Sequence, residues 1–349
     1  MTILLMLGLH GKAQINIEPI DSIVQNAVEK ELFEGTVLIA ENGNVVYQEC
    51  FGFTDKDKDI PIENATSFSI ASITKLFTAI IILQLVEEGK LQLSVNLKTL
   101  FPELEIPKTD EITVHHLLLH ISGLPNENDI IYTQPTGPQK FVTETLSNAY
   151  NRFGEFNYAN IDYVLLGLII EKQDSIAWEK SVQQRILDKA GMTQTGFLKR
   201  ENYPKNFAYT FSYDKEGIRQ ADPLFYIENY HAAGCMYSTA ENLLKLDQAM
   251  YGNELLSEES KELLYTSYPE YNYSGYSVWT YHYPFAKSQP KVMERRGGIL
   301  GANSVLVRML DANKTIIILS NNNKFNPDSF GDTQGLKEGL MIEVDKINR

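Results

Sequence analysis

Cysteine is scarce in this sequence, with only Cys50 and Cys235 in 349 residues. Two cysteines make no disulfide framework and no recognisable metal site, although a single bridge between them stays open. Basic residues are also in deficit, because 31 Lys and Arg face 45 Asp and Glu, for a net charge of −14. This balance argues against nucleic acid or an anionic membrane as a partner.

Long apolar runs are missing as well. Beyond the first nine residues, no stretch reaches the about 18 consecutive apolar residues of a membrane-spanning helix, so we expect no integral membrane segment. The N-terminus has a shorter apolar run, residues 1–9, followed by small residues at Gly11 and Ala13. This pattern predicts a truncated signal peptide at residues 1–13, without its positively charged n-region, and a periplasmic or secreted location. A buried N-terminal strand is the alternative.

Strand patterns lie at both ends of the chain. Residues 35–40 and 45–51 are joined by Asn42-Gly43, which predicts a β-hairpin. Later strands are predicted at 276–283, 291–296, 302–310 and 314–319, and helices at 18–33, 114–120, 161–171, 178–189, 239–250 and 329–347. We therefore predict an α/β (α+β) fold, with an antiparallel sheet formed from both chain ends and helices on both of its faces.

The same pattern predicts the domain organisation. Residues 18–61 and 266–349 form the sheet subdomain, and residues 62–265 form an inserted, mostly helical subdomain. The active site is expected between the two. Nothing in the sequence predicts an oligomeric state.

A serine and a lysine stand three residues apart where an apolar helix is predicted to begin, as Ser72 and Lys75. The helix has apolar residues at helical spacing and on most sides, which predicts that it is buried, and it ends near Gly89. Ser72 at its N-terminal end would have free N–H groups and the positive end of the dipole beside it. Lys75 on the same face would accept the serine proton if burial lowers the lysine pKa.

A simpler interpretation is that Ser72 only caps the helix and Lys75 is a surface lysine. The Ser-x-x-Lys pattern also occurs at Ser212–Lys215 and Ser288–Lys291, in polar or Pro-containing surroundings. The pattern alone therefore does not decide between these interpretations.

Two further groups of residues suit acyl-transfer chemistry. Tyr158 and Asn160 precede the helix at 161–171; a tyrosine beside a cation can move protons, and an asparagine amide can bind a substrate carbonyl.

Arg296, followed by two glycines, ends a predicted strand, where a substrate backbone can lie along the strand edge and the arginine would face a carboxylate. The glycines are Gly297 and Gly298, and the N–H groups of Ser72 and Ile299 would hold the oxyanion. A tight turn between strands is the simpler interpretation of the arginine and the glycines.

The order of these motifs resembles that of the serine β-lactamase and penicillin-binding-protein superfamily. Within it, the chain looks like the class C β-lactamase-like group, which includes D,D-peptidases and esterases. Two other segments agree, since residues 113–125 are similar to the group's "LL-x-H-x-SGLP" segment and residues 232–242 to its "AGG-x-x-ST-x-x-DL" segment. The resemblance covers residues from about 18 to 345.

The resemblance implies roles for the motif residues. Ser72 is the nucleophile, Lys75 its proton partner, Tyr158 the base and then the acid to the leaving group, and Asn160 a substrate-binding residue. Arg296, Gly297 and Gly298 match the third motif, in which the family usually has Lys or His first. No metal or organic cofactor is implied.

Some positions depart from the family or carry no role in it. An arginine at position 296 keeps the positive charge but never deprotonates, which argues against efficient β-lactam hydrolysis. Cys235 replaces the second glycine of the "AGG" segment. His120 and His231 are expected to be structural, because the mechanism already has its base.

These observations predict an exported serine hydrolase that forms an acyl-enzyme on Ser72 with a small ester, amide or D-amino-acid peptide. Two alternatives stay open. A true β-lactamase needs a water activated on the acyl-enzyme, which the sequence does not reveal. A sensor that binds penicillin or peptidoglycan fragments would be acylated with little turnover.

Overall fold

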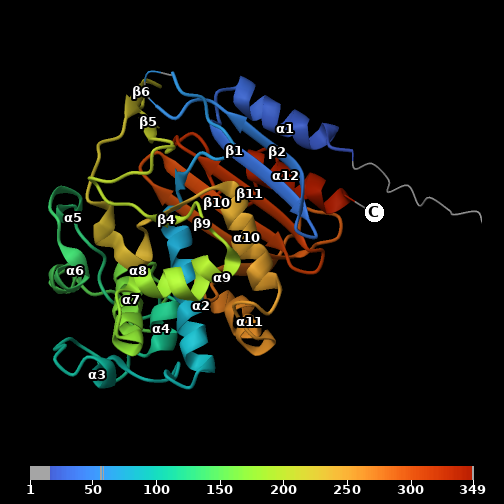
Figure 1. The fold of residues 1–349 in the computed structure, drawn as a ribbon. Helices are drawn as coiled ribbons and strands as arrows, with labels where there is room; N and C mark the ends of the chain where they lie inside the picture. Colours follow the sequence, from blue (N-terminus) through green and yellow to red (C-terminus); the bar gives the residue numbers. More distant parts are fainter. Residues whose placement is uncertain (1–15, 56, 58, 348–349) are drawn as a thin grey trace, which may run out of the picture.

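The computed structural model describes residues 16–55, 57 and 59–347, so the predicted signal peptide lies outside the described residues. Its largest sheet has six strands in the order β2-β1-β11-β10-β9-β8, which brings strands from both ends of the chain side by side (Figure 1). Every neighbouring pair is antiparallel. The strands are β1 (Gly35–Glu41), β2 (Asn44–Phe51), β8 (Trp279–His282), β9 (Lys291–Ile299), β10 (Ala302–Met309) and β11 (Lys314–Ser320).

The β1–β2 hairpin follows from its turn. Asn42 and Gly43 have φ values of 50° and 75°, the left-handed pair that a tight two-residue hairpin requires. β1 then pairs with β11 from Gly35 opposite Ser320 to Glu41 opposite Lys314, which joins the two ends of the chain.

Side chains of the sheet alternate between two separate cores. Val37 and Ile39 pack with α1 (Glu18–Glu29) and α12 (Leu336–Lys346) on one face. Leu38 and Ala40 face the helical part of the chain on the other. This alternation is the period-two consequence of a pleated strand, and it sets the face to which every β9 side chain points.

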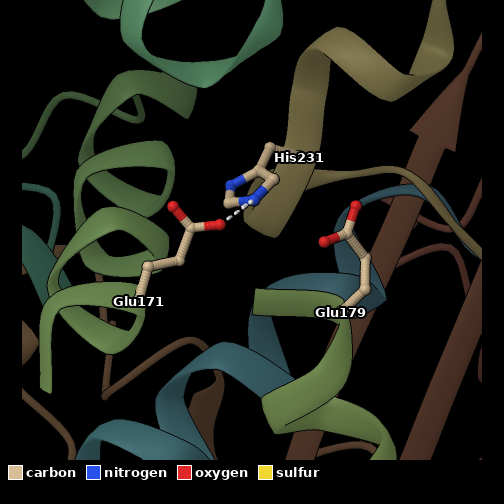
Figure 2. Close-up of side chains that lie close together, drawn as sticks. All are labelled: Glu171, Glu179 and His231. Atoms are coloured by element: carbon tan, nitrogen blue, oxygen red, sulfur yellow. Dashed lines mark ion pairs between the residues drawn. The ribbon is translucent and has the colours of Figure 1, made fainter. Parts of the chain in front are cut away.

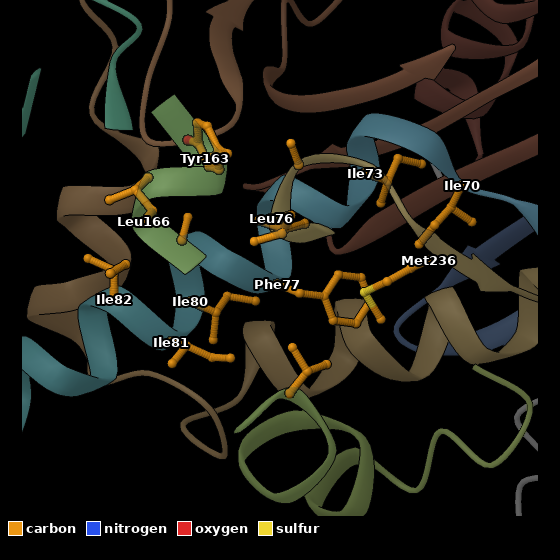
Figure 3. Close-up of a cluster of buried hydrophobic side chains, with 14 of the residues drawn as sticks. Ile70, Ile73, Leu76, Phe77, Ile80, Ile81, Ile82, Tyr163, Leu166 and Met236 are labelled. Atoms are coloured by element: carbon orange, nitrogen blue, oxygen red, sulfur yellow. The ribbon is translucent and has the colours of Figure 1, made fainter. Parts of the chain in front are cut away.

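Helix α2 (Thr74–Glu87) is the centre of the larger core. Every residue from 74 to 85 is buried, and Figure 3 shows its apolar side chains packed against residues of other segments, among them Tyr163, Leu166 and Met236. Gly89 follows the helix with a φ of 68°, as a glycine just beyond a helix C-terminus commonly does. The predicted burial of this helix is therefore confirmed.

The middle of the chain supplies most of the remaining helices and two small sheets. The three-stranded sheet β3-β7-β4 matters for the site, because β3 leads into the segment of Ser72. The helical segments are η1 (Ala71–Ile73), α3 (Leu97–Leu100), α4 (Val114–Leu118), α5 (Ile130–Thr133), α6 (Gly137–Thr145), α7 (Asn160–Asp174), α8 (Trp178–Val182), η2 (Gln183–Leu187), α9 (Asp188–Ala190), η3 (Ile227–Ala233), α10 (Ala240–Tyr251), α11 (Glu258–Tyr265) and η4 (Pro269–Tyr271). The short strands are β3 (Phe68–Ser69), β4 (Gly196–Phe197), β5 (Phe211–Tyr213), β6 (Arg219–Ala221) and β7 (Met236–Ser238).

The predicted fold class is confirmed: an antiparallel sheet drawn from both chain ends carries helices on both faces. The division at residues 61/62 and 265/266 stays a prediction. Cys50 and Cys235 are free thiols, so the bridge left open by the sequence is not formed. In the described part of the chain, no helix combines the length and the apolar character that crossing a bilayer requires.

Candidate active site

Ser72 lies in the 3-10 turn η1, directly before α2, and its side chain is partly exposed between the buried Ala71 and Ile73. The turn is reached through an unusual backbone conformation, since Ala71 has a φ of 42°. Such left-handed non-glycine residues are concentrated at functional sites. The position leaves the N–H groups of the first helical turn and the positive end of the dipole close to the serine, as the sequence predicted.

Lys75 is completely buried and directs its ammonium group at Ser72. Its Nζ donates to Ser72 Oγ at 3.0 Å, to Asn160 Oδ1 at 2.7 Å and to the Ala233 carbonyl at 2.7 Å. Burial lowers the pKa of Lys75, and the charge of Arg295 lowers it further, whereas Tyr158 opposes the change. The lysine therefore lies within proton-transfer distance of Ser72 in surroundings that favour its neutral form.

Tyr158 faces the same group of atoms. Its phenolic oxygen accepts a hydrogen bond from Arg295 Nη2 at 3.0 Å, and Lys75 Nζ lies 5.0 Å from the centre of its ring. Burial alone would raise the pKa of Tyr158, but the positive charges of Lys75 and Arg295 outweigh it and lower the pKa to about 8. Tyr158 is thus able to take up and return a proton near neutral pH.

Arg296 is not where the sequence predicted it, and this is a correction. Its guanidinium pairs with Glu294 and with Asp328, on the sheet face that carries α12. Glu294 on the same face is itself held by Lys337 Nζ at 2.8 Å. Since β9 side chains alternate between faces, Arg296 points away from Ser72 and does not face a substrate carboxylate there.

Arg295 is the arginine on the Ser72 side of the sheet. It is 1% exposed, and its Nε donates to the Ser72 carbonyl at 2.7 Å while Nη1 donates to the Ser277 carbonyl at 2.7 Å. Arg295 is not among the residues that the sequence motifs predicted. Counting the alternation along 291–299 would have indicated that only one of two adjacent arginines can share a face with the nucleophile.

Gly297 explains how β9 approaches the nucleophile so closely. A Cβ on this residue would lie 2.2 Å from the Ile70 carbonyl oxygen and 3.2 Å from the Ile73 nitrogen. Only a glycine allows this strand and the turn η1 to meet. Beyond Glu294, which pairs with Trp279, β9 has no further partner in β8, and no other strand in the described part of the chain pairs with Gly298 or Ile299 on that side. Gly298 is exposed and Ile299 partly buried.

Asn160 is the first residue of α7 and links Lys75 to a carboxylate that the sequence analysis did not consider. Its Oδ1 accepts from Lys75, and its Nδ2 donates to Glu127 Oε1 at 2.6 Å. Glu127 is partly buried and belongs to the loop after Pro125. A single glutamate in a loop gives no sequence signal, because only the packing of this loop on α7 reveals the contact.

His120 contacts the loop of Tyr158. Its ring lies 4.3 Å from the Tyr158 ring, its Nδ1 accepts from the Ala159 N–H at 3.3 Å, and the same Nδ1 lies 2.9 Å from Asp162 Oδ2. Burial lowers the pKa of His120 and raises the pKa of Asp162, both strongly, which favours the neutral form of each group. His120 thus has positioning contacts, which agrees with the structural role expected for it.

A second cluster of titratable side chains joins α7, α8 and η3, and comprises Glu171, Glu179 and His231 (Figure 2). One potential ligand atom from each lies within 4.8 Å of the others. His231 Nε2 is 3.4 Å from a Glu171 oxygen, and its ring packs 5.0 Å from that of Trp178. An ion pair and ring packing are ordinary contacts of a structural histidine, and the expectation that no metal takes part stays a prediction.

Comparison with known proteins defines the family. The family model described as Beta-lactamase matches residues 20–340. The chain therefore belongs to the Beta-lactamase family and, with it, to the superfamily of serine β-lactamases and penicillin-binding proteins, as its motifs indicated. Membership of the class C group stays a prediction.

Curated relatives and solved structures agree with this assignment. Penicillin-binding protein 4* of Bacillus subtilis (strain 168) is 27% identical over 325 residues, covering 86% of this chain and 71% of that protein. An octameric penicillin-binding protein homologue from Pyrococcus abyssi is 26% identical with a TM-score of 0.79, covering 95% of this chain and 79% of the other. A D-amino acid amidase from Ochrobactrum anthropi SV3, with a TM-score of 0.77, 22% identity and coverage of 94% and 95%, shares the fold.

Proposed function

We propose that this protein is an exported serine hydrolase that forms an acyl-enzyme on Ser72 with a small ester, amide or D-amino-acid peptide. The observation that carries the proposal is the 3.0 Å hydrogen bond from Lys75 Nζ to Ser72 Oγ. Tyr158, with its pKa lowered to about 8, completes the proton-transfer group. Membership of the Beta-lactamase family supports the reaction class, and the names of relatives and neighbours support these acyl compounds.

The first half of the reaction follows from the two proton carriers. Burial favours a neutral Lys75, whereas the neighbouring cations favour a Tyr158 phenolate, so the two groups titrate as one coupled pair. In either arrangement of their shared proton, one of them can accept the proton of Ser72. Ser72 Oγ then bonds to the substrate carbonyl carbon, and the same pair returns the proton to the leaving group as its bond to that carbon breaks.

The negative oxygen formed in this step needs N–H donors. The Ser72 N–H at the start of α2 is one candidate. Because Arg295, not Arg296, faces the nucleophile, the third motif begins one residue earlier than the sequence predicted. We therefore propose the N–H of the exposed Gly298 as the second donor, whereas the sequence motif predicted the N–H of Ile299. In the second half, the same pair takes a proton from a water molecule whose oxygen bonds to the acyl carbon. The pair returns this proton to Ser72 Oγ as the ester bond to the serine breaks and the acid product leaves.

The proposed location rests on residues 1–9 and on the small residues at Gly11 and Ala13, which fit a signal peptide. We accordingly place the activity in the periplasm or outside the cell. Mass spectrometry of the N-terminus of the protein secreted from an expressing bacterium tests this, with cleavage after Ala13 as the expected result.

The activity is tested by intact-mass measurement after mixing the protein with a penicillin and, separately, with p-nitrophenyl acetate. We expect release of nitrophenol at many equivalents per protein, and none with Ser72→Ala folded to the same melting temperature. A persistent penicillin adduct on Ser72 without turnover of either compound would instead indicate a sensor. Equal nitrophenol release by the Ser72→Ala variant would exclude the proposed nucleophile.

A further inference from the structure

The positive charges beside the nucleophile are not available to a substrate. Arg295 is 1% exposed, and each of its three guanidinium nitrogens donates to a protein oxygen, on Ser72, Ser277 or Tyr158. Lys75 is fully buried and makes three hydrogen bonds of its own. Arg296, the residue expected to hold a carboxylate, is on the opposite face of the sheet with Glu294 and Asp328. A carboxylate on the substrate therefore finds no open cation among these residues.

A carboxylate, by contrast, is joined to the same group of side chains through Asn160. Glu127 is partly exposed and accepts a hydrogen bond from Asn160 at 2.6 Å. Among the described residues, no Lys, Arg or His forms an ion pair with it. Its charge is felt at Lys75, whose pKa it raises against the effect of burial. The carboxylate is thus electrostatically coupled to the reacting groups and lacks a cationic partner of its own.

The hydrogen bond to Glu127 also changes what Asn160 offers. An asparagine amide has one acceptor oxygen and two N–H donors. Here the oxygen accepts from Lys75, and an N–H is engaged by Glu127. One N–H of Asn160 is thus already engaged, and the partly exposed Glu127 carboxylate beside it is an acceptor for hydrogen-bond donors on a substrate.

We infer that Glu127 selects acyl compounds that carry an ammonium group close to the reacting carbonyl, such as amino-acid amides and esters with a free amine. Compounds with a carboxylate in the same region are disfavoured. This inference rests on the proposed hydrolase activity and narrows its substrate class. A charged hydrogen bond between ammonium and carboxylate is among the stronger single contacts that a site can make.

Competition against a neutral reporter substrate tests the inference. Hydrolysis of p-nitrophenyl acetate is followed at pH 7, where an α-amino group with an ordinary pKa of about 7.7–8.0 is mostly protonated. Three competitors are compared: racemic alaninamide (ammonium), N-acetylalaninamide (neutral) and N-acetylalanine (carboxylate). We expect alaninamide to inhibit at concentrations about tenfold or more below those of the other two, as one charge-assisted contact provides.

Glu127→Gln keeps an acceptor for Asn160 but removes the charge. We expect it to reduce the preference for alaninamide over N-acetylalaninamide to less than about threefold. The preference is the ratio of the inhibitory concentrations of the two amides in one variant. A changed Lys75 pKa alters the rate of the reporter reaction for both amides equally, so it does not change this ratio. Glu155→Gln is the matched control, because Glu155 is an exposed loop acid whose partner is Arg152 at 2.8 Å. It should keep the wild-type preference.

The outcomes distinguish a failure of the inferred selectivity of Glu127 from a failure of the proposed hydrolase activity. Equal inhibition by all three compounds, tightest binding of N-acetylalanine, or an unchanged preference in Glu127→Gln would overturn the inference and leave the hydrolase intact. Absence of any hydrolysis that depends on Ser72 would overturn both.

Discussion

Arg295 donates a hydrogen bond to the phenolic oxygen of Tyr158 at 3.0 Å while its Nε donates to the Ser72 carbonyl. One buried guanidinium thus connects the proposed nucleophile to the proposed base. Arginine side chains carry a fixed positive charge in proteins and have no acceptor atom. Arg295 therefore stabilises the Tyr158 phenolate at every pH, as a lysine or histidine that titrates would not.

The adjacent arginines provide a matched test of this relationship. In Arg295→Gln the loss of a nearby positive charge disfavours the phenolate, so the pKa of Tyr158 rises above about 8. We expect the rising limb of kcat/KM against pH, measured with p-nitrophenyl acetate, to move upward by at least about one pH unit.

Arg296→Gln is the control, because its side chain lies on the other face of the sheet. Its pH profile should match that of the wild type, and circular dichroism melting should show that both variants fold. Equal upward displacement of the profile in both variants would contradict the assignment of Arg295 to the site.

Lys75 should be required for acylation. Lys75→Ala removes the group that hydrogen-bonds Ser72 Oγ at 3.0 Å, and loss of such an acid–base partner lowers rates by about 10²–10⁴-fold. We expect the rate of acetylation by p-nitrophenyl acetate, followed by rapid-quench intact mass, to fall at least about 100-fold. Lys172→Ala is the matched control. Lys172 lies on α7 and donates to the Leu100 carbonyl of α3, so its loss should leave the acetylation rate within about twofold of wild type. A reduction of less than about tenfold in Lys75→Ala would assign the proton transfer to Tyr158 alone.

Local patterns in the sequence predicted those parts of the molecule that depend on local rules. Apolar periodicity indicated the buried helix α2, and Asn42-Gly43 indicated the β1–β2 hairpin. Motif order placed Ser72, Lys75 and Tyr158 in one group, and hydrogen bonds link Ser72 and Tyr158 to Lys75 or Arg295 in the structure.

The two parts that were missed depend on long-range geometry. The face of β9 that meets the nucleophile is decided by the register of the whole sheet, so a motif written as a string of letters was placed one residue late, on Arg296. Glu127 contacts Asn160 across 33 positions of the sequence. No periodicity or spacing relates two such residues, and only the packed loop brings them together. The predicted helix at 178–189 is one continuous helical segment in the structure, with a π-helical turn at Gln183–Leu187 between α8 and α9.

Gly297 should tolerate no side chain. In Gly297→Ala the new Cβ would lie 2.2 Å from the Ile70 carbonyl oxygen, so β9 or the turn of Ser72 must move. We expect a loss of about 1–3 kcal/mol in the free energy of unfolding, in the range of overpacked cores, measured by urea denaturation.

Gly298→Ala serves as the comparison for stability, because its new Cβ would meet a side-chain atom, Asn303 Oδ1 at 3.1 Å, and no backbone atom closer than 3.9 Å. It should lose less than half as much stability as Gly297→Ala. The reverse order would show that the close contact of Gly297 with Ile70 does not hold these segments together.

The buried Asp162 predicts a pH dependence of stability with a definite sign. Burial raises its pKa well above the ordinary value, so the folded protein holds a proton that the unfolded chain releases above a pKa of about 3.9. The contribution of this group to stability is therefore fully present below that pH and is lost as the pH rises toward the folded pKa. In Asp162→Asn the neutral amide can still accept from Ser122 Oγ, which lies 2.6 Å from Asp162 Oδ1, and donate to His120 Nδ1.

We therefore expect the difference in free energy of unfolding between Asp162→Asn and the wild type to change in favour of the variant between pH 5 and pH 8. Urea denaturation at several pH values measures this difference, and the other titrating groups cancel in the comparison. If Asp162 were instead a charged partner of a protonated His120, the variant would lose a buried ion pair and be less stable by about 3–5 kcal/mol near neutral pH. If the difference in free energy of unfolding is constant between pH 5 and pH 8, or changes in the opposite direction, the pair of His120 and Asp162 is not neutral. The pair would then add a charge beside the loop of Tyr158.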